Sequence, residues 1–156
     1  MTKKLLITLF CFSFFVSVSQ ETDSAEFKQY FYKTGELSSE GNLKNGNPVG
    51  YWKSYYKNGN IKTEGNRLGE DLDGKWKFYS EEGQLNLIIT YRENKKTGER
   101  ITFYNNGTEK RKELYVNDKK EGLSTDYFSN GNLKKQVPFV NGREQGTGLE
   151  YDEKGL

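Results

Sequence analysis

The segment "YYKNGNIKTEG" (residues 55–65) determines the fold, because close copies of it recur along the chain. Two aromatic residues lead into Lys-Asn-Gly, and a short alternating stretch then ends in Glu-Gly. The same order is found in "FYKTGELSSEG" (31–41), and "YFSNGNLKKQV" (127–137) repeats the aromatic pair, the turn and the alternating stretch. Asn-Gly favours the positive φ values of tight hairpin turns, and alternation of apolar and polar residues is typical of strands. Each copy therefore predicts a turn followed by a β-strand.

Two series of glycines repeat at a constant spacing of 24 residues. An aromatic residue precedes each glycine of the first series by four positions. We interpret both series as structural turn residues without a chemical role: Gly35, Gly59, Gly83, Gly107, Gly131 and Gly155, and Gly50, Gly74, Gly98, Gly122 and Gly146. A single hairpin cannot bury its aromatic side alone, whereas stacked copies cover one another. The period thus predicts an all-β fold, an elongated single-layer antiparallel meander or solenoid of about five β-hairpin repeats.

The two connections in each repeat are expected to differ in length. The first is a short turn such as "KNG" (57–59), and the second is a longer one, such as "NDKKEG" (117–122), that ends on a glycine of the second series. Pro138 falls within a predicted strand, where the missing N–H should weaken or bulge the pairing.

The N-terminal segment "MTKKLLITLFCFSFFVSVSQ" (1–20) has the pattern of a secretory signal peptide. Lys3 and Lys4 precede an apolar run that is too short to span a bilayer, and small residues precede Gln20. We expect residues 1–19 to be a signal peptide, 20–29 a linker and 30–156 the repeat domain. Cys11 lacks the small preceding residues of a lipidated cysteine. The predicted product is exported and soluble, in the periplasm, on the outer surface or secreted.

Composition excludes several kinds of chemistry. The chain has no histidine and one cysteine, Cys11, which lies in the predicted signal peptide, so histidine acid–base chemistry and a Cys nucleophile are ruled out. Removal of Lys3 and Lys4 would leave equal numbers of basic and acidic residues, which argues against nucleic-acid binding. No phosphate loop or metal-ligand motif is present, and "GEDLDG" (69–74) lacks calcium-loop spacing. We expect neither an enzyme nor a cofactor or metal site.

The segment "YKNGNIKTEGNRLGEDLDGKWKFY" (56–79) and its copies resemble the MORN (membrane occupation and recognition nexus) repeat in its bacterial variant form. The shared pattern is Tyr-x-x-Asn-Gly, then Glu-Gly, then Gly-x-Trp, and it covers about residues 30 to 156. Glu-Gly is lost from the third repeat on, and Gly-x-Trp occurs only twice. Some bacterial members are labelled YwqK-like antitoxins, so the resemblance implies the repeat architecture and an antitoxin or immunity role.

Binding is the function that these features favour. We predict a non-enzymatic scaffold for a protein partner, contacted through an aromatic-rich sheet face that carries Trp52, Tyr56, Trp76 and Phe78. The alternative for the four rings is that they form the thickest part of the core. The alternative function is a cell-envelope module for glycan or phospholipid, for which "YWKSYY" (51–56) would supply an aromatic cage.

Overall fold

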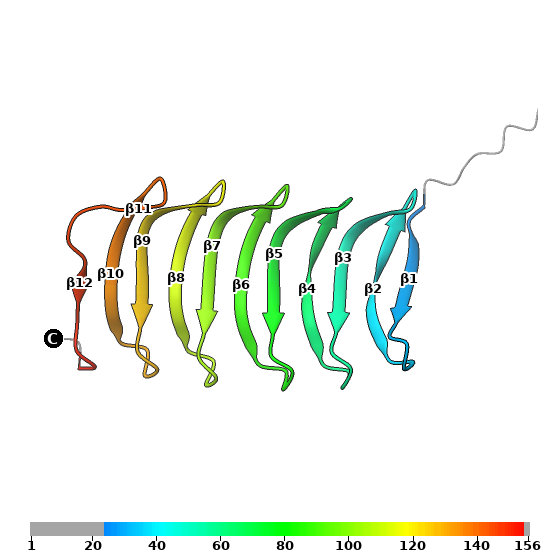
Figure 1. Ribbon diagram of the computed structural model, residues 1–156, viewed down its shortest axis with the longest axis horizontal. Coiled ribbons are helices and arrows are strands. Elements are labelled where there is room, and N and C mark those ends of the chain that lie inside the picture. The colour runs from blue at the N-terminus through cyan, green and yellow to red at the C-terminus, as the bar shows by residue number, and fades with distance from the viewer. Residues whose placement is uncertain (1–23, 155–156) are drawn as a thin grey trace, which may run out of the picture.

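The protein is one antiparallel β-sheet, as the period predicts. The computed structural model describes residues 24–154, and these contain twelve strands and no helix. The strands are β1 (Glu26–Phe31), β2 (Leu37–Lys44), β3 (Asn47–Tyr55), β4 (Ile61–Leu68), β5 (Asp71–Tyr79), β6 (Leu85–Arg92), β7 (Lys95–Phe103), β8 (Glu109–Val116), β9 (Lys119–Tyr127), β10 (Leu133–Val140), β11 (Arg143–Glu144) and β12 (Leu149–Glu150). Strands β1 to β11 pair in chain order and β12 returns to β10, which gives a single curved layer (Figure 1). The predicted fold class is confirmed.

The predicted signal peptide lies outside the described residues, so it stays a prediction. The sheet begins at Glu26, within the segment expected to be a linker. Strand β1 is the edge of the sheet next to this end of the chain (Figure 1).

The first connection of each repeat is a five-residue turn. In 56–60 the amide of Tyr56 donates to the carbonyl of Asn60 at 2.8 Å, and the amide of Gly59 donates to the carbonyl of Tyr56 at 3.0 Å. The Asn58 side chain accepts from the amide of Asn60 at 2.9 Å. Gly59 has φ +85°, a value that side chains rarely allow, so the first glycine series is needed for this turn.

The second connection is the shorter one, so the expected order of lengths is wrong. At 117–118, for example, only Asn117 and Asp118 separate β8 from β9, and both have positive φ, as in a type I′ turn. The glycines expected at the end of this connection, Gly50, Gly74, Gly98 and Gly122, lie inside strands instead. Asn and Asp tolerate the left-handed backbone conformation well enough to make this turn without those glycines.

These internal glycines form β-bulges. Between the pairs Glu64–Lys77 and Asn66–Asp73, β4 has one residue and β5 has three, beginning with Gly74 at φ +70°. A bulge of this kind bends its strand. Gly146 (φ +71°) has a related position, in the interruption between β11 and β12.

Pro138 lies in β10, and pairing is weakened on one side of it, as predicted. On the β9 side the register runs through Pro138 without a shift. On the outer side β11 pairs only with Phe139 and Val140, and β12 pairs only with Lys135 and Gln136. Because Pro138 accepts from Gln145 at 2.9 Å on that side, its missing N–H also points there.

Tyrosine hydroxyls tie consecutive repeats together. Tyr32, Tyr56 and Tyr104 donate to main-chain carbonyls 23 residues further on, those of Tyr55, Tyr79 and Tyr127, at 2.6 to 2.8 Å. This bond links a hairpin to the next one in three repeats, whereas Ser80 and Phe128 occupy the tyrosine position in the other two.

Candidate functional site

The two faces of the sheet follow from strand register, because directly opposed residues point to the same side. One face carries Trp52 and Trp76, and we call it the tryptophan face. The other carries Glu64 and Ile101, and we call it the opposite face. Register places Trp76 opposite Ile89 and Glu64 opposite Lys77, so the two rows stay separate across the sheet.

Each tryptophan ring lies over a glycine of the preceding strand. A Cβ atom placed on Gly41 would overlap the ring of Trp52, and one on Gly65 would overlap the ring of Trp76. The Trp76 indole N–H also donates to the carbonyl of Asn66 at 2.9 Å. The glycine of Glu-Gly is therefore required by the tryptophan of the next strand, which explains why both disappear from the same repeats.

An ion cluster continues this row in the later repeats. Register runs from Trp76 to Ile89, to Arg100 and to Glu113. Arg100 Nη1 lies 2.7 Å from Glu113 Oε2, and Lys120 Nζ lies 2.6 Å from Oε1. Burial of Glu113, which is 3 % exposed, raises its pKa, but hydrogen bonds and charge from Lys120 and Arg100 outweigh burial and lower the pKa overall.

The opposite face contains tyrosine–glutamate pairs. The Tyr55 hydroxyl donates to Glu40 and the Tyr79 hydroxyl donates to Glu64, each at 2.6 Å. Burial and this bond raise the pKa of Tyr55 to about 12. Burial raises the pKa of Glu64, but hydrogen bonds from Tyr79, Tyr51 and Lys77 together hold it below its usual value.

The next repeat loses both members of this pair. Ile88 and Phe103 stand at the positions of the carboxylate and the phenol, so the acceptor and the hydroxyl disappear together.

Exposed apolar side chains gather on the opposite face. Of the ten large apolar side chains that are exposed among the described residues, register assigns nine to this face and only Tyr30 to the tryptophan face. The nine are Phe27, Phe31, Tyr51, Leu68, Leu114, Val116, Leu123, Val140 and Leu149. Leu114, Val116, Leu123 and Val140 come from the neighbouring strands β8, β9 and β10, and we call these four residues the leucine–valine cluster.

The residues predicted for partner binding lie in the N-terminal half of the sheet, and most of their surface is buried. Trp52 is 9 % exposed and Trp76 is 6 % exposed, and Phe78 is half-buried. The Tyr56 hydroxyl donates a hydrogen bond to the carbonyl of Tyr79. A hollow of about 270 Å³ lies between the two tryptophans, and the Arg67 guanidinium stands 5.8 Å from the Trp76 ring. Burial of the rings favours the core alternative, while their direct contact with a partner stays a prediction.

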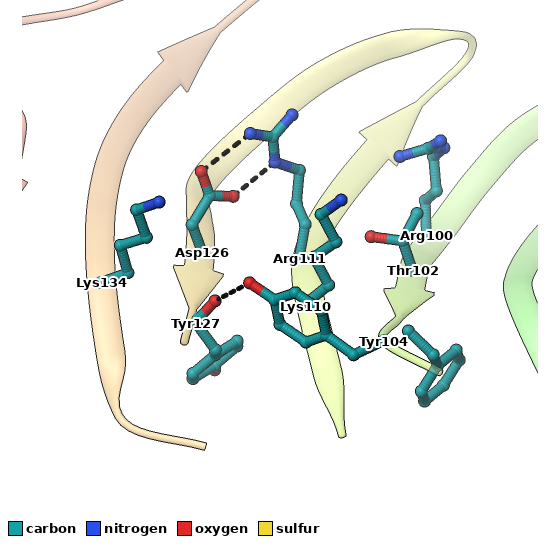
Figure 2. Close-up of a pocket in the computed structure, with 9 residues that line it drawn as sticks. Arg100, Thr102, Tyr104, Lys110, Arg111, Asp126, Tyr127 and Lys134 are labelled. Atoms are coloured by element: carbon teal, nitrogen blue, oxygen red, sulfur yellow. Dashed lines mark hydrogen bonds and ion pairs between the residues drawn. The ribbon is translucent and has the colours of Figure 1, made fainter. Parts of the chain in front are cut away.

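A second hollow, of about 420 Å³, lies on the tryptophan face in the later repeats and is lined by cations (Figure 2). Arg111 is neutralised by two bonds to Asp126, one of them 2.8 Å long, as the dashed lines show. Lys110 and Lys134 instead stand over the rings of Tyr104 and Phe128, at 5.5 and 5.4 Å. The hollow therefore offers mainly two lysines to an anion.

Sequence reasoning missed the exposed apolar side chains. Three of them, Leu68, Val116 and Val140, occupy the same repeat position just before the second connection. That recurrence was a usable signal. It was weak because Lys44 and Arg92 occupy the position in the other repeats.

Three segments match the MORN repeat variant, at residues 48–67, 72–93 and 120–141. They correspond to the hairpins β3–β4, β5–β6 and β9–β10. Each match in this chain therefore spans one hairpin, and MORN repeats are typically binding modules. Comparison with curated proteins gave no match.

Residues 24–154 hold no group of three or more acidic, His or Cys side chains arranged for a metal ion. The same residues include no helix with the length and hydropathy to cross a bilayer.

Proposed function

We propose that the chain is a non-enzymatic repeat scaffold for a protein partner and that the partner docks on the opposite face. The observation that carries the proposal is the distribution of exposed apolar side chains, nine of ten on that face. Contiguous exposed apolar groups are typical of protein interaction sites, whereas isolated ones are ordinary.

The composition of the opposite face also suits a protein partner. The leucine–valine cluster provides apolar contact, and the Lys112–Glu99 pair and Glu121, which is opposed to Leu114, add polar groups of both signs beside it. An apolar centre within a polar rim is the usual anatomy of such interfaces.

An envelope glycan or phospholipid is the second candidate, supported by the cationic hollow of Figure 2. Arg100 and Arg111 are already paired with Glu113 and Asp126, which leaves Lys110 and Lys134 for an anion. Two exposed lysines provide less binding energy than the apolar cluster, so we place this candidate second.

Export is part of the proposal and rests on the signal-peptide pattern of residues 1–19. An exported scaffold with the resemblance to antitoxins described above would act on a partner outside the cytoplasm, in an immunity-like role. Sequencing of the mature N-terminus tests export: we expect it at Gln20, and a product that retains Met1 would contradict it.

The docking face can be tested by retention of a partner on the immobilised protein. An envelope extract is passed over wild type, over the double variant Leu114→Lys/Leu123→Lys and over the control Ser54→Lys, which adds a charge to the tryptophan face. We expect one stoichiometric protein on wild type, at least a roughly tenfold loss on the double variant, and no loss on the control.

Melting temperatures of the three proteins show whether each remains folded. Retention of purified glycan or lipid without any protein would contradict the proposed function. Loss on Ser54→Lys alone would move the docking site to the tryptophan face.

A further inference from the structure

The two edges of the sheet differ in how they are closed. At the C-terminal edge the last strand is broken into β11 and β12, of two residues each, separated by a segment that contains Gly146. At the other edge β1 is six residues long and pairs only with β2 among the described strands. Short, interrupted edge strands prevent sheet-to-sheet pairing, and a regular edge strand permits it.

The outer edge of β1 has a defined set of main-chain groups that pair with no other described strand. The carbonyl of Tyr30 faces β2, because it accepts from the Ser38 hydroxyl at 2.9 Å, and the amide of Tyr32 bonds within the first turn at 2.8 Å. Main-chain groups alternate in direction along a strand, so those of Phe27, Gln29 and Phe31 point away from β2.

The side chains of the same three residues lie on the opposite face. Phe27 and Phe31 are 57 % and 59 % exposed. Lys28 and Tyr30 lie on the tryptophan face, since they are opposed to Gly41 and Ser39.

In one antiparallel register, the β1 edges of two copies can pair so that every opposed pair of side chains is compatible. If Gln29 of one copy opposes Gln29 of the other, Phe27 opposes Phe31 and Lys28 opposes Tyr30. The three outward residues then exchange about six hydrogen bonds. The phenylalanines form two aromatic cross-strand pairs, and each lysine meets a tyrosine ring. A shift by two residues in one direction would place Lys28 against Lys28, which is unfavourable, and in the other direction it would lose both Phe27–Phe31 pairs.

We infer that β1 is a self-association edge: two copies of the chain pair through β1 about a twofold axis at Gln29 and form one continuous sheet. Such an interface is isologous and closes after two copies, because the broken C-terminal edges cannot extend it. The tryptophan faces of the two copies become continuous, and so do the opposite faces.

The mass of the protein in solution tests this inference. Protein expressed from the full coding sequence is measured by light scattering at concentrations from about 1 to 100 µM, without any partner. We expect twice the mass of one chain. A monomer over this range would overturn the inference and would leave the docking face untouched, since neither test depends on the other.

Charge variants test the register. Phe27→Lys/Phe31→Lys places lysine opposite lysine. We expect the dissociation constant of the dimer to rise roughly tenfold or more. Phe27→Glu/Phe31→Lys places glutamate opposite lysine and should restore the dimer. The matched control is Leu149→Lys, since Leu149 is also 57 % exposed on the same face but at the far end of the sheet.

A dimer that survives the lysine pair, or one that the Glu/Lys pair does not restore, would contradict the β1 register. A second measurement does not depend on the phenylalanines. In a Cys11→Ser background, Gln29→Cys should form a disulfide between copies on oxidation, because directly paired strand residues lie about 5.5 Å apart at Cα. Leu149→Cys should not, and equal cross-linking at both positions would overturn the inference.

Discussion

The β4–β5 and β8–β9 hairpins have the same main-chain frame but cover the centre of the tryptophan face differently. In the first, the Trp76 ring lies on Gly65, and its indole N–H donates to the carbonyl of Asn66. In the second, Arg100 and Lys120 enclose the carboxylate of Glu113. Both centres are well buried: Trp76 is 6 % exposed and Glu113 is 3 % exposed.

This difference shows that the repeat fixes the backbone and leaves the side chains free to change in sets. A large ring needs a glycine beneath it, so the pair Gly65 and Trp76 can only change together. In the following repeat, Ile89 and Arg100 stand at the positions of Gly65 and Trp76. The charge of Arg100 then needs the carboxylate of Glu113, which is opposed to it on the next strand. Single substitutions within a set should therefore cost more than double ones.

The largest effect is expected from Gly65→Ile, which breaks the first set. The new side chain would overlap the Trp76 ring, and overpacking of this kind costs about 3 kcal/mol of unfolding free energy. The double variant Gly65→Ile/Trp76→Arg copies the later repeat and should recover at least about half of that loss. Urea unfolding of the three proteins measures both values.

Gly59→Ala is a control for backbone strain, because its Cβ would meet no atom within 4 Å. A double variant less stable than the single one would contradict coupled change.

Trp76→Ala should be nearly as damaging, because it uncovers Gly65 and removes a buried ring. We expect a loss of about 2–3 kcal/mol, below the full range for a core tryptophan, since the sheet has no second layer. Trp52→Ala should act in the same way. Retention of the partner at a temperature where both variants are folded should be unchanged. Lost retention with little loss of melting temperature would instead establish the tryptophans as the binding residues.

Glu113→Gln tests the second set and should have a smaller effect. It leaves Arg100 and Lys120 without a charge partner, but both are partly solvated, so we expect a loss of about 1–2 kcal/mol at neutral pH. The pKa of Glu113 is lowered in the folded protein, so its contribution is present above the unfolded pKa of about 4.3 and is lost as pH falls through the folded value. The melting temperature of wild type should thus approach that of the variant between about pH 5 and 3. A constant difference across this range would show that the carboxylate charge is not responsible.

Tyr79→Phe should have the smallest effect, and it imitates the Phe103 of the next repeat. It removes the hydroxyl that donates to Glu64, and the net loss of one such bond is about 1 kcal/mol. Phe103→Tyr is the reciprocal control: Ile88 offers no acceptor there, so no gain is expected. Thermal unfolding of both variants decides this, and equal effects of the two changes would contradict the pairing of Glu with Tyr.

The sequence predicted the architecture well, because one uninterrupted period determines the number and order of the strands. It misjudged the connections, since Asn45-Gly46 and Asn58-Gly59 look alike locally, although the first forms an entire two-residue turn and the second lies within a five-residue one. Whether the tryptophans are covered also could not be read from alternation. Their burial depends on Gly41 and Gly65, which precede them by eleven positions and meet them only through strand pairing.

The exposed apolar residues were missed for a related reason. Leu114 and Leu123 do not occupy equivalent repeat positions, and only the register of β8, β9 and β10 brings them to one face. Periodicity identifies residues that recur, whereas a surface assembled from different repeat positions requires the structure.

Site-specific photo-crosslinking tests the docking face most directly. Leu123 and Ser124 are neighbours on β9 but point to the opposite face and the tryptophan face, respectively. A photoreactive residue is placed at one position or the other, and the protein is irradiated with its retained partner. We predict a covalent adduct from position 123 and none from position 124. An adduct from position 124 alone would contradict docking on the opposite face.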